Sequence, residues 1–447
     1  MKIITTSGAL SDRTVVSHAV LQPDSANREE LILNLYPEER FQPFLGFGGA
    51  VTDSAAYVYS TLSPELMAEV IAACYGSDGL GYTLARSHID SCDFSLESYC
   101  ADSAATDAAL EHFSLERPGK YIFPMLDDIV KACPDLRLLL SPWSPPEYMK
   151  DNAKRTGGGK LRPEFRERWA QYMCRYALEY RKRGYDVFAM SVQNEPNAVQ
   201  TWESCIYTPE EERDFLRGFL APELRRQGLG DVVLTIWDHN KERLFDRVDA
   251  ICSESEANAC VGAAGFHWYG GDHFDALRLV RRKYPDKLLM FTEGCIEYSK
   301  GSHGAQTENA ERYAREILHG FNAGLNAFFD WNLLLDMSGG PNHKGNYCDA
   351  PIMADAEQNL LKYNLSYSYI RHFSRYIRPG AVRIGTTCYD NDLGFCAALD
   401  SDGSIAAVAL NTSATGKKGF VRLHGELAEA FFPPHSITTL LIGGEEA

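Results

Sequence analysis

The chain lacks the features that mark membrane and secreted proteins. It has no run of about 18 apolar residues, the length that suggests a membrane span. Residues 1–8 show no apolar segment of the kind found in a signal peptide. The 12 cysteines are scattered, and no two of them stand in a C-x-x-C spacing. We therefore expect reduced thiols, no metal site and a cytoplasmic location.

Positive charge is also scarce. The chain has 44 Lys and Arg against 61 Asp and Glu, which gives a formal net charge of −17. An acidic surface repels phosphate groups, so we expect no nucleic-acid partner and no stable membrane association. A neutral ligand such as a small soluble glycoside or oligosaccharide is not repelled. The sequence does not indicate an oligomeric state.

Eight short apolar runs are present, and helical patterns separate them. This alternation predicts a (β/α)₈ TIM barrel over residues 41–378, and 447 residues leave room for an accessory domain. In such a barrel, the functional groups lie at the carboxyl ends of the strands. The eight predicted strands are Pro43–Gly48, Gly81–Ser87, Leu136–Leu140, Tyr185–Val192, Val232–Ile236, Ala263–Phe266, Lys287–Phe291 and Leu325–Phe329.

A different pattern begins near residue 379. Short alternating stretches punctuated by Asn, Asp and Gly predict a small antiparallel β-sandwich over residues 379–447. Residues 1–40 have the same character, so we expect them to add strands to this side domain and to bring the two chain ends together. The predicted strands are Val15–Leu21, Leu31–Tyr36, Val382–Thr386, Leu393–Leu399, Ser404–Leu410, Gly419–Leu423 and Ser436–Ile442.

Two glutamates follow two of the predicted barrel strands. Glu195 stands in the segment Ser191–Pro196, and Glu293 stands in Phe291–Gly294. Glycoside hydrolysis needs two carboxyl groups, one to protonate the leaving oxygen and one to attack the sugar or activate a water. We therefore expect Glu195 and Glu293 to form a catalytic pair that requires no cofactor.

The neighbouring polar residues suggest supporting roles. Asn194 could bind the sugar 2-hydroxyl, and Tyr269 could donate a hydrogen bond to the nucleophile. Trp143 and Trp331 could form apolar walls, although each alone is more often a core residue. Arg86 could pair with Asp93, or it could belong to a buried structural ion pair.

Three histidines at strand ends support a rival hypothesis. His88, His239 and His267 could bind zinc in a metal-dependent barrel hydrolase. Barrel enzymes of that kind usually show His-x-His after the first strand, and this chain has Gly46–Gly49 there. A barrel that binds sugar without catalysis is a further alternative, and the presence of both glutamates argues against it.

Several motifs together resemble glycoside hydrolase family 30, and within it the glucosylceramidases. They occur in the family's order, from about residue 44 to 380. The matching stretches are Gly46–Ser54, Ser91–Ser95, Ser141–Pro146, Gln193–Pro196, Phe266–Tyr269, Thr292–Gly294, Asp330–Leu333 and Gly339–Asn342.

The resemblance implies a retaining β-glycosidase without a metal. It makes Glu195 the acid/base and Glu293 the nucleophile. The expected sugar-binding residues are Arg86, Asp93, Trp143, Asn194, His267, Tyr269, Trp331 and Asn346. We expect cleavage of terminal β-glucosyl residues, with β-xylosidase and endo-β-1,6-glucanase activity as alternatives.

Overall fold

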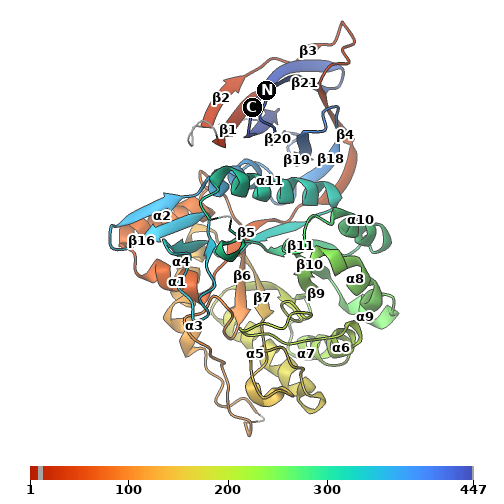
Figure 1. Ribbon diagram of the computed structural model, residues 1–447. Helices are drawn as coiled ribbons and strands as arrows, with labels where there is room; N and C mark the ends of the chain where they lie inside the picture. Colours follow the sequence, from red (N-terminus) through yellow and green to blue (C-terminus); the bar gives the residue numbers. More distant parts are fainter. Residues whose placement is uncertain (9–13, 108, 302, 445–447) are drawn as a thin grey trace.

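The computed structural model describes residues 1–8, 14–107, 109–301 and 303–444. Its centre is a closed barrel of eight parallel strands, each beside its predecessor in the barrel, with the last strand closing against the first (Figure 1). The predicted (β/α)₈ barrel is confirmed. Its strands are β5 (Gly46–Ala50), β6 (Leu84–Ile89), β7 (Arg137–Pro142), β8 (Asp186–Ser191), β9 (Val233–Asn240), β10 (Ala263–His267), β11 (Leu288–Glu293) and β13 (Ala327–Asp330).

Helices surround the barrel, and sequence signals fix several of their starts. Ser63 caps α2, and Thr208 forms a capping box with Glu211 at the start of α6. Among the described residues, no helix combines the length and apolarity needed to cross a membrane. The helices are α1 (Asp53–Ser60), α2 (Pro64–Tyr75), α3 (Glu116–Lys120), α4 (Ile122–Ala132), α5 (Arg166–Lys182), α6 (Pro209–Phe215), α7 (Ala221–Arg226), α8 (Leu244–Cys252), α9 (Ser255–Cys260), α10 (Phe274–Lys283), α11 (Gln306–Ala323) and α12 (Leu365–Ser374).

Single turns of other helix types connect some of these elements. They are η2 (Glu147–Met149), η3 (Pro163–Phe165), η4 (Leu216–Leu220), η5 (Lys241–Arg243) and η6 (Tyr298–Lys300). One face of α5 carries large side chains that belong to the core. Trp169, Tyr172, Tyr176 and Tyr180 on α5 are all buried.

The barrel interior is a packed core and not a pore. Leu84, Leu139, Phe188, Met290 and Phe329 belong to one buried cluster contributed by the barrel strands. Close approach of β5 to β6 explains a glycine in the first strand. A Cβ atom on Gly48 would collide with the carbonyl oxygen of Leu84, so only glycine allows this strand spacing.

A ten-stranded sheet, here called the side sheet, curves over α11 and joins the two ends of the chain (Figure 1). Strands β1 and β23 pair with Lys2 opposite Leu441, so the predicted meeting of the termini is confirmed. The pairing is antiparallel except between β4 and β21, which are parallel. The strand order is β2 (Thr14–His18), β1 (Lys2–Ser7), β23 (Ser436–Ile442), β20 (Ile405–Asn411), β19 (Leu393–Leu399), β18 (Val382–Cys388), β4 (Ile32–Pro43), β21 (Lys417–Leu423), β22 (Glu426–Phe432) and β3 (Gln22–Pro23).

Two small sheets are formed by short strands in the loop after β11 and in the segment between β13 and α12. They were not predicted from the sequence, because their strands have only two to four residues each. Figure 1 shows β16 beside α2, away from the side sheet. Their strands are β12 (Ile296–Glu297) with β15 (Cys348–Asp349), and β14 (Leu334–Asp336) with β16 (Ile352–Asp355) and β17 (Leu360–Tyr363).

A buried histidine joins the barrel to the side sheet. The ring nitrogens of His372 on α12 lie 2.8 Å from Thr439 Oγ1 and 2.9 Å from Thr6 Oγ1. The Thr439 hydroxyl donates to the His372 carbonyl oxygen, so the ring Nδ1 must donate to Thr439. Nδ1 therefore carries a hydrogen, and burial lowers the pKa of His372 to about 3, which keeps the ring neutral at neutral pH.

Acid should weaken this junction. Between pH 7 and pH 5, His372 binds a proton in the unfolded chain but not in the folded one, so stability falls as the pH falls towards 3. Urea unfolding should show His372→Gln losing about 2 kcal/mol less than the parent between pH 7 and pH 5. His424→Gln, at a mostly exposed histidine, is the control and should behave like the parent. An identical pH dependence in His372→Gln and the parent would contradict the assignment.

Candidate active site

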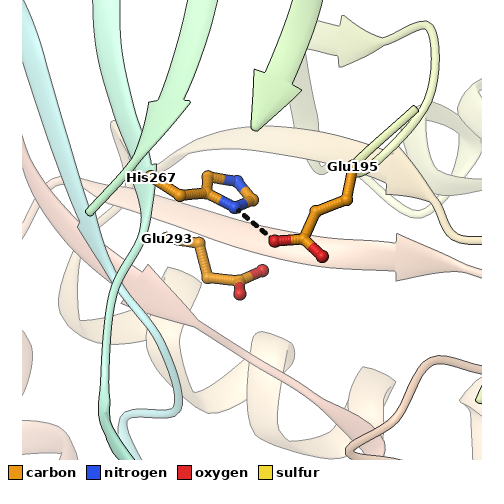
Figure 2. A group of neighbouring side chains, drawn as sticks. All are labelled: Glu195, His267 and Glu293. Carbon is orange, nitrogen blue, oxygen red and sulfur yellow. Dashed lines mark hydrogen bonds and ion pairs between the residues drawn. The ribbon is translucent and has the colours of Figure 1, made fainter. Parts of the chain in front are cut away.

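The two glutamates meet at the carboxyl ends of the barrel strands. Glu293 is the last residue of β11, and Glu195 follows the end of β8 by four residues. One oxygen of each carboxyl group and one ring nitrogen of His267 lie within 4.8 Å of one another (Figure 2). Retaining glycosidases hold their carboxyl groups about 5–5.5 Å apart, and inverting enzymes about 6.5–9.5 Å. The spacing fits the retaining arrangement.

Backbone strain gathers at the same end of the barrel. Asp90, Glu195, Trp237, Asp238 and Asn332 have φ angles between 46° and 69°, which are unfavourable for residues other than glycine. Each residue lies in the last part of a barrel strand or within four residues of its end. Such strain persists only where surrounding contacts fix the backbone, and it is common at functional sites.

Arg86 on β6 connects the elements of the site. Its side chain is fully buried, and its guanidinium donates to Asp238 at 2.9 Å and to Glu293 at 2.8 Å. The same group donates to the Asn194 side chain at 2.8 Å, the Ser141 hydroxyl at 3.1 Å and the Thr292 carbonyl at 3.1 Å. These five acceptors match the five N–H groups that arginine carries. The suggested pairing of Arg86 with Asp93 is therefore wrong.

Glu293 is held at both of its carboxylate oxygens. Arg86 donates to Oε2, and the Tyr269 hydroxyl donates to Oε1 at 3.0 Å. The second contact is the hydrogen bond that the sequence suggested for Tyr269. The Glu293 side chain remains 9% exposed, so it reaches the cavity although it is fixed from below.

The contacts of Glu195 are longer. Nδ1 of His267 lies 3.1 Å from Glu195 Oε1, and Nε2 of His239 lies 3.9 Å from the same oxygen. The other nitrogen of His267 lies 3.1 Å from Asp238, which also pairs with Arg86. His267 is fully buried, so its ring orients the Glu195 carboxyl group from inside the protein.

The pKa directions follow these contacts. Burial lowers the pKa of His267, but the surrounding carboxylates outweigh burial and raise it to about 9. Burial raises the pKa of Asp238, but Arg86 and His267 hold it well below the usual range. Burial raises the pKa of Glu293 against the opposing charges of His267 and Arg86. Burial is outweighed at Glu195, whose pKa is lowered by the hydrogen bond from His267 and the charge of His239.

A cavity of about 200 Å³ opens above the two glutamates. Arg86 and His267 do not line it and instead contact the carboxylates from below. The stacked rings of Trp143 and Trp331 form part of its wall, with centroids 5.4 Å apart. The other predicted residues that line it are Asp93, Asn194, Glu195, Tyr269, Glu293 and Asn346.

Further residues line the cavity that sequence reasoning did not assign to the site. Trp202 and Tyr347 come from loops, where no periodic pattern indicates which side chains face a ligand. Asp238 lies beneath the cavity, and its position at a strand end was the only signal for it. His239, which the sequence suggested only as a zinc ligand, also lines the cavity. The remaining unassigned lining residues are Phe94, Gln200, Asn240, Cys295, Glu297, Lys300 and Cys348.

The three histidines proposed as zinc ligands do not form a common site. Both ring nitrogens of His88 are engaged by backbone atoms of Asp53 and Asp90. Within the described part of the chain, the group with metal-ligand spacing is Glu195, His267 and Glu293. Because the ring nitrogens of His267 already contact Glu195 and Asp238, this group does not offer the three free histidines of the zinc hypothesis.

Family profiles match most of the chain. The profile described as glycosyl hydrolase family 30 TIM-barrel domain matches residues 44–377, and the one described as glycosyl hydrolase family 30 beta sandwich domain matches residues 380–440. The chain belongs to glycoside hydrolase family 30. Members of family 30 are retaining O-glycosidases, in agreement with the spacing of the glutamates.

Relatives of this family 30 enzyme carry different names. Putative glucosylceramidase 3 of Caenorhabditis elegans is 33% identical over 368 residues, which cover 79% of this chain and 70% of the relative. The crystal structure of SrfJ from Salmonella typhimurium matches with a TM-score of 0.95 and 35% identity over 99% of both chains. The endo-β1,6-glucanase BT3312 matches with a TM-score of 0.89 and 27% identity over 99% of both chains.

Removing the central cation should destabilise the family 30 enzyme. Arg86→Met leaves Glu293 without its ion-pair partner and leaves Asp238 with His267 as its remaining charged partner, so the free energy of unfolding should fall by about 3–5 kcal/mol. Arg315→Met is the control, because Arg315 pairs with Asp272 on the surface and should contribute less than about 1 kcal/mol. Urea unfolding at neutral pH measures both. Equal stability of the two variants would contradict the role given to Arg86.

Proposed function

We propose that the enzyme releases terminal β-glucosyl residues from a soluble glycoside or short oligosaccharide. Glu293 is the nucleophile and Glu195 is the general acid and base of a double displacement. The observation that carries this proposal is the unequal set of donors around the two glutamates.

The donors around Glu293 favour its ionised form. Arg86 and Tyr269 each donate to a different oxygen, at 2.8 Å and 3.0 Å, and hydrogen bonds to both oxygens stabilise a carboxylate. Glu195 has the longer contacts to His267 and His239, at 3.1 Å and 3.9 Å. An ionised Glu293 is ready to attack, and a protonated Glu195 is ready to donate.

A charge count supports one shared proton. The buried cluster contains two cations, Arg86 and His267, and three acids, Asp238, Glu195 and Glu293. Since two cations balance two carboxylates, one glutamate retains a proton near neutral pH.

The pKa directions and the contacts disagree on which glutamate holds this proton. Taken singly, the raised pKa of Glu293 and the lowered pKa of Glu195 place it on Glu293. The contacts place the proton on Glu195. A proton on Glu293 would weaken the 2.8 Å ion pair with Arg86, whereas a proton on Glu195 weakens only the longer contact with His267.

The reaction then proceeds in two displacements. Glu293 attacks the anomeric carbon while Glu195 protonates the leaving oxygen, so an ester bond forms as the glycosidic bond breaks. Glu195, now ionised, takes a proton from a water molecule, whose oxygen displaces Glu293. Two inversions at one carbon retain the configuration.

The cavity is small for a substrate of several sugar rings. Its volume of about 200 Å³ is below the about 300–1,000 Å³ of pockets for drug-sized ligands. Asp93 Oδ1 is buried beside the cavity and has no hydrogen-bond partner among the described residues, while Oδ2 accepts from Asn346 at 3.1 Å. A sugar hydroxyl would provide the missing partner. The enclosed volume therefore favours exo-action.

Two alternatives within the family remain as competing activities. The likeness to the endo-β1,6-glucanase BT3312 over 99% of both chains supports cleavage inside a β-1,6-glucan. A β-xyloside would also place one ring in the cavity, without the hydroxymethyl group of glucose. The first alternative differs in the linkage that the site cleaves, and the second differs in the sugar that it binds.

Comparison of aryl β-glycosides tests the sugar assignment. The enzyme should have a higher kcat/KM on the β-glucoside than on the β-xyloside or β-fucoside by about tenfold or more, because buried groups that bind a missing hydroxyl are left unpaired. Glu293→Gln is the control for contaminating activity and should hydrolyse none of them. Equal or faster cleavage of the xyloside would refute glucose as the preferred sugar. A ladder of oligomers from β-1,6-glucan would refute exo-action.

A further inference from the structure

The leaving group must lie on the Glu195 side of the cleavage point, because Glu195 protonates the leaving oxygen in the proposed mechanism. Glu195 begins the loop of residues 192–208 between β8 and α6. Trp202 stands seven residues later on the same loop, is half-buried and lines the cavity together with Glu195. The loop that carries Glu195 therefore also supplies an aromatic side chain to the cavity.

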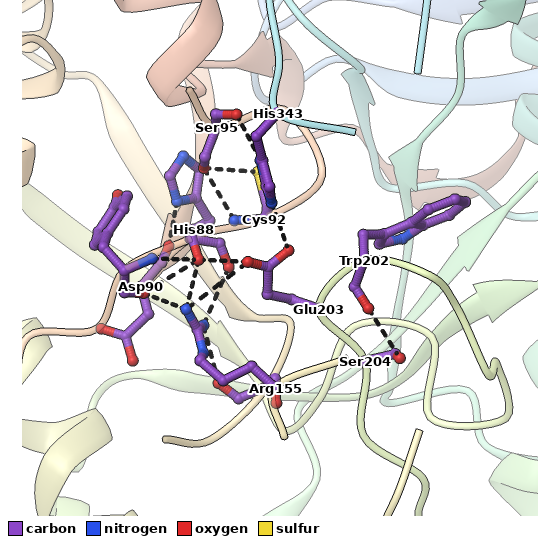
Figure 3. Close-up of polar contacts among 12 residues, drawn as sticks. His88, Asp90, Cys92, Ser95, Arg155, Trp202, Glu203, Ser204 and His343 are labelled. Atoms are coloured by element: carbon purple, nitrogen blue, oxygen red, sulfur yellow. Dashed lines mark hydrogen bonds and ion pairs between the residues drawn. The ribbon is translucent and has the colours of Figure 1, made fainter. Parts of the chain in front are cut away.

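The chain next to Trp202 is extended and paired. Glu203 forms a backbone bridge with Thr156, and the Ser204 amide donates to the Arg155 carbonyl at 2.9 Å. Neighbouring residues of an extended segment point in opposite directions. The Glu203 side chain thus enters the protein, while the Trp202 indole points away from it (Figure 3).

The carboxylate of Glu203 ties three other loops to this segment. Its side chain is fully buried, and Oε1 accepts from the Ser91 hydroxyl at 2.7 Å. Arg155 lies 3.9 Å from Oε1, and Nε2 of His343 lies 3.4 Å from Oε2 (Figure 3). Nδ1 of His343 donates to the Ser95 carbonyl, which leaves Nε2 to face Glu203.

These partners stabilise the ionised form of the Glu203 carboxyl group. Burial alone raises the pKa of its carboxyl group, but the contact with His343, the charge of Arg155 and nearby serine hydroxyls lower it to about 2. His343 belongs to the same loop as Asn346 and Tyr347, which line the cavity. One buried carboxylate therefore fixes both loops beside the leaving group.

We propose that the Trp202 indole is a stacking platform for the sugar ring of the leaving group, and that Glu203 is the positioning residue that holds it. This inference rests on the proposed glucosidase function and specifies that the leaving group of the substrate is a pyranose. A sugar ring presents an apolar face of C–H groups to an aromatic ring and keeps its hydroxyls for polar partners. Gln200, Asn240 and Glu297 line the same cavity and provide such partners.

Two donors with the same glucosyl group test the platform. A β-1,6-linked glucose disaccharide places a ring against Trp202, whereas β-glucosyl fluoride has a leaving group too small to reach it. Trp202→Ala should lose about tenfold more kcat/KM on the disaccharide than on the fluoride, and Trp202→Phe should lose less. Val199→Ala, at an exposed residue of the same loop, is the control and should change neither.

The outcomes separate this inference from the proposed function. If the parent enzyme cleaves neither donor, the glucosidase proposal fails and the platform fails with it. If the parent cleaves both and Trp202→Ala loses equally on both, only the platform is refuted. Octyl β-glucoside is the third donor, and an equal loss on it and on the disaccharide would show an apolar-chain site and refute the pyranose assignment.

A double-mutant cycle tests the positioning role of Glu203. Glu203→Gln removes the charge that faces His343 and keeps the shape of the side chain. Alone, it should shift the ratio of kcat/KM for disaccharide to fluoride in the direction of Trp202→Ala, and in the Trp202→Ala background it should shift the ratio little further. Additive shifts, or no shift in the ratio, would refute the role. His343→Gln tests the same contact from its other side if Glu203→Gln does not fold.

Discussion

One buried guanidinium organises the catalytic end of this barrel. Arg86 reaches from β6 to side chains or carbonyls at the ends of β7, β9 and β11 and in the loop after β8, and all five of its N–H groups are used. Its charge also lies 4.9 Å from the ring centroid of Trp143 and 5.6 Å from that of Trp331. A buried cation is costly unless it is paired, so the positions of Asp238 and Glu293 are tied to it.

The different catalytic roles of the two glutamates follow from this constraint. Glu293 and Asp238 both form ion pairs with the Arg86 guanidinium, whereas Glu195 does not contact Arg86 and instead contacts His267. Two residues of the same type on strands of the same barrel thus have different surroundings. The difference in direct donors separates nucleophile from acid, as glycoside hydrolysis requires. The aromatic residues around the cavity then pack against the sugar ring that the two carboxyl groups position.

The sequence predicts the barrel and its glutamates because parallel strands end on one face. A glutamate near the carboxyl end of a strand therefore lies on that face, even when its partner is 98 residues away (293 − 195). Partners within the site are harder to predict, since Arg86 could reach several carboxylates and only the three-dimensional packing selects Asp238 and Glu293 over Asp93. The predicted cytoplasmic location remains a prediction.

Sequence patterns are least informative for the loops and for strands of unusual composition. Strand β22 (Glu426–Phe432) is rich in Glu and Ala, which favour helices, and it is a strand because it pairs along its length with β21. Strand β2 is exposed throughout, and the strand predicted at Val15–Leu21 overlaps it but extends beyond its end at His18. Trp202 and Tyr347 lie in loops whose course depends on buried polar contacts such as those of Glu203.

The central claim is that the carboxylate held by Arg86 and Tyr269 forms the covalent intermediate. A 2-deoxy-2-fluoro-β-glucosyl fluoride slows both steps of a double displacement and lets the glycosyl-enzyme accumulate. Peptide mapping of the trapped protein by mass spectrometry locates the attached sugar. The account predicts a single 2-fluoroglucosyl group on Glu293. A sugar attached to Glu195 would contradict it.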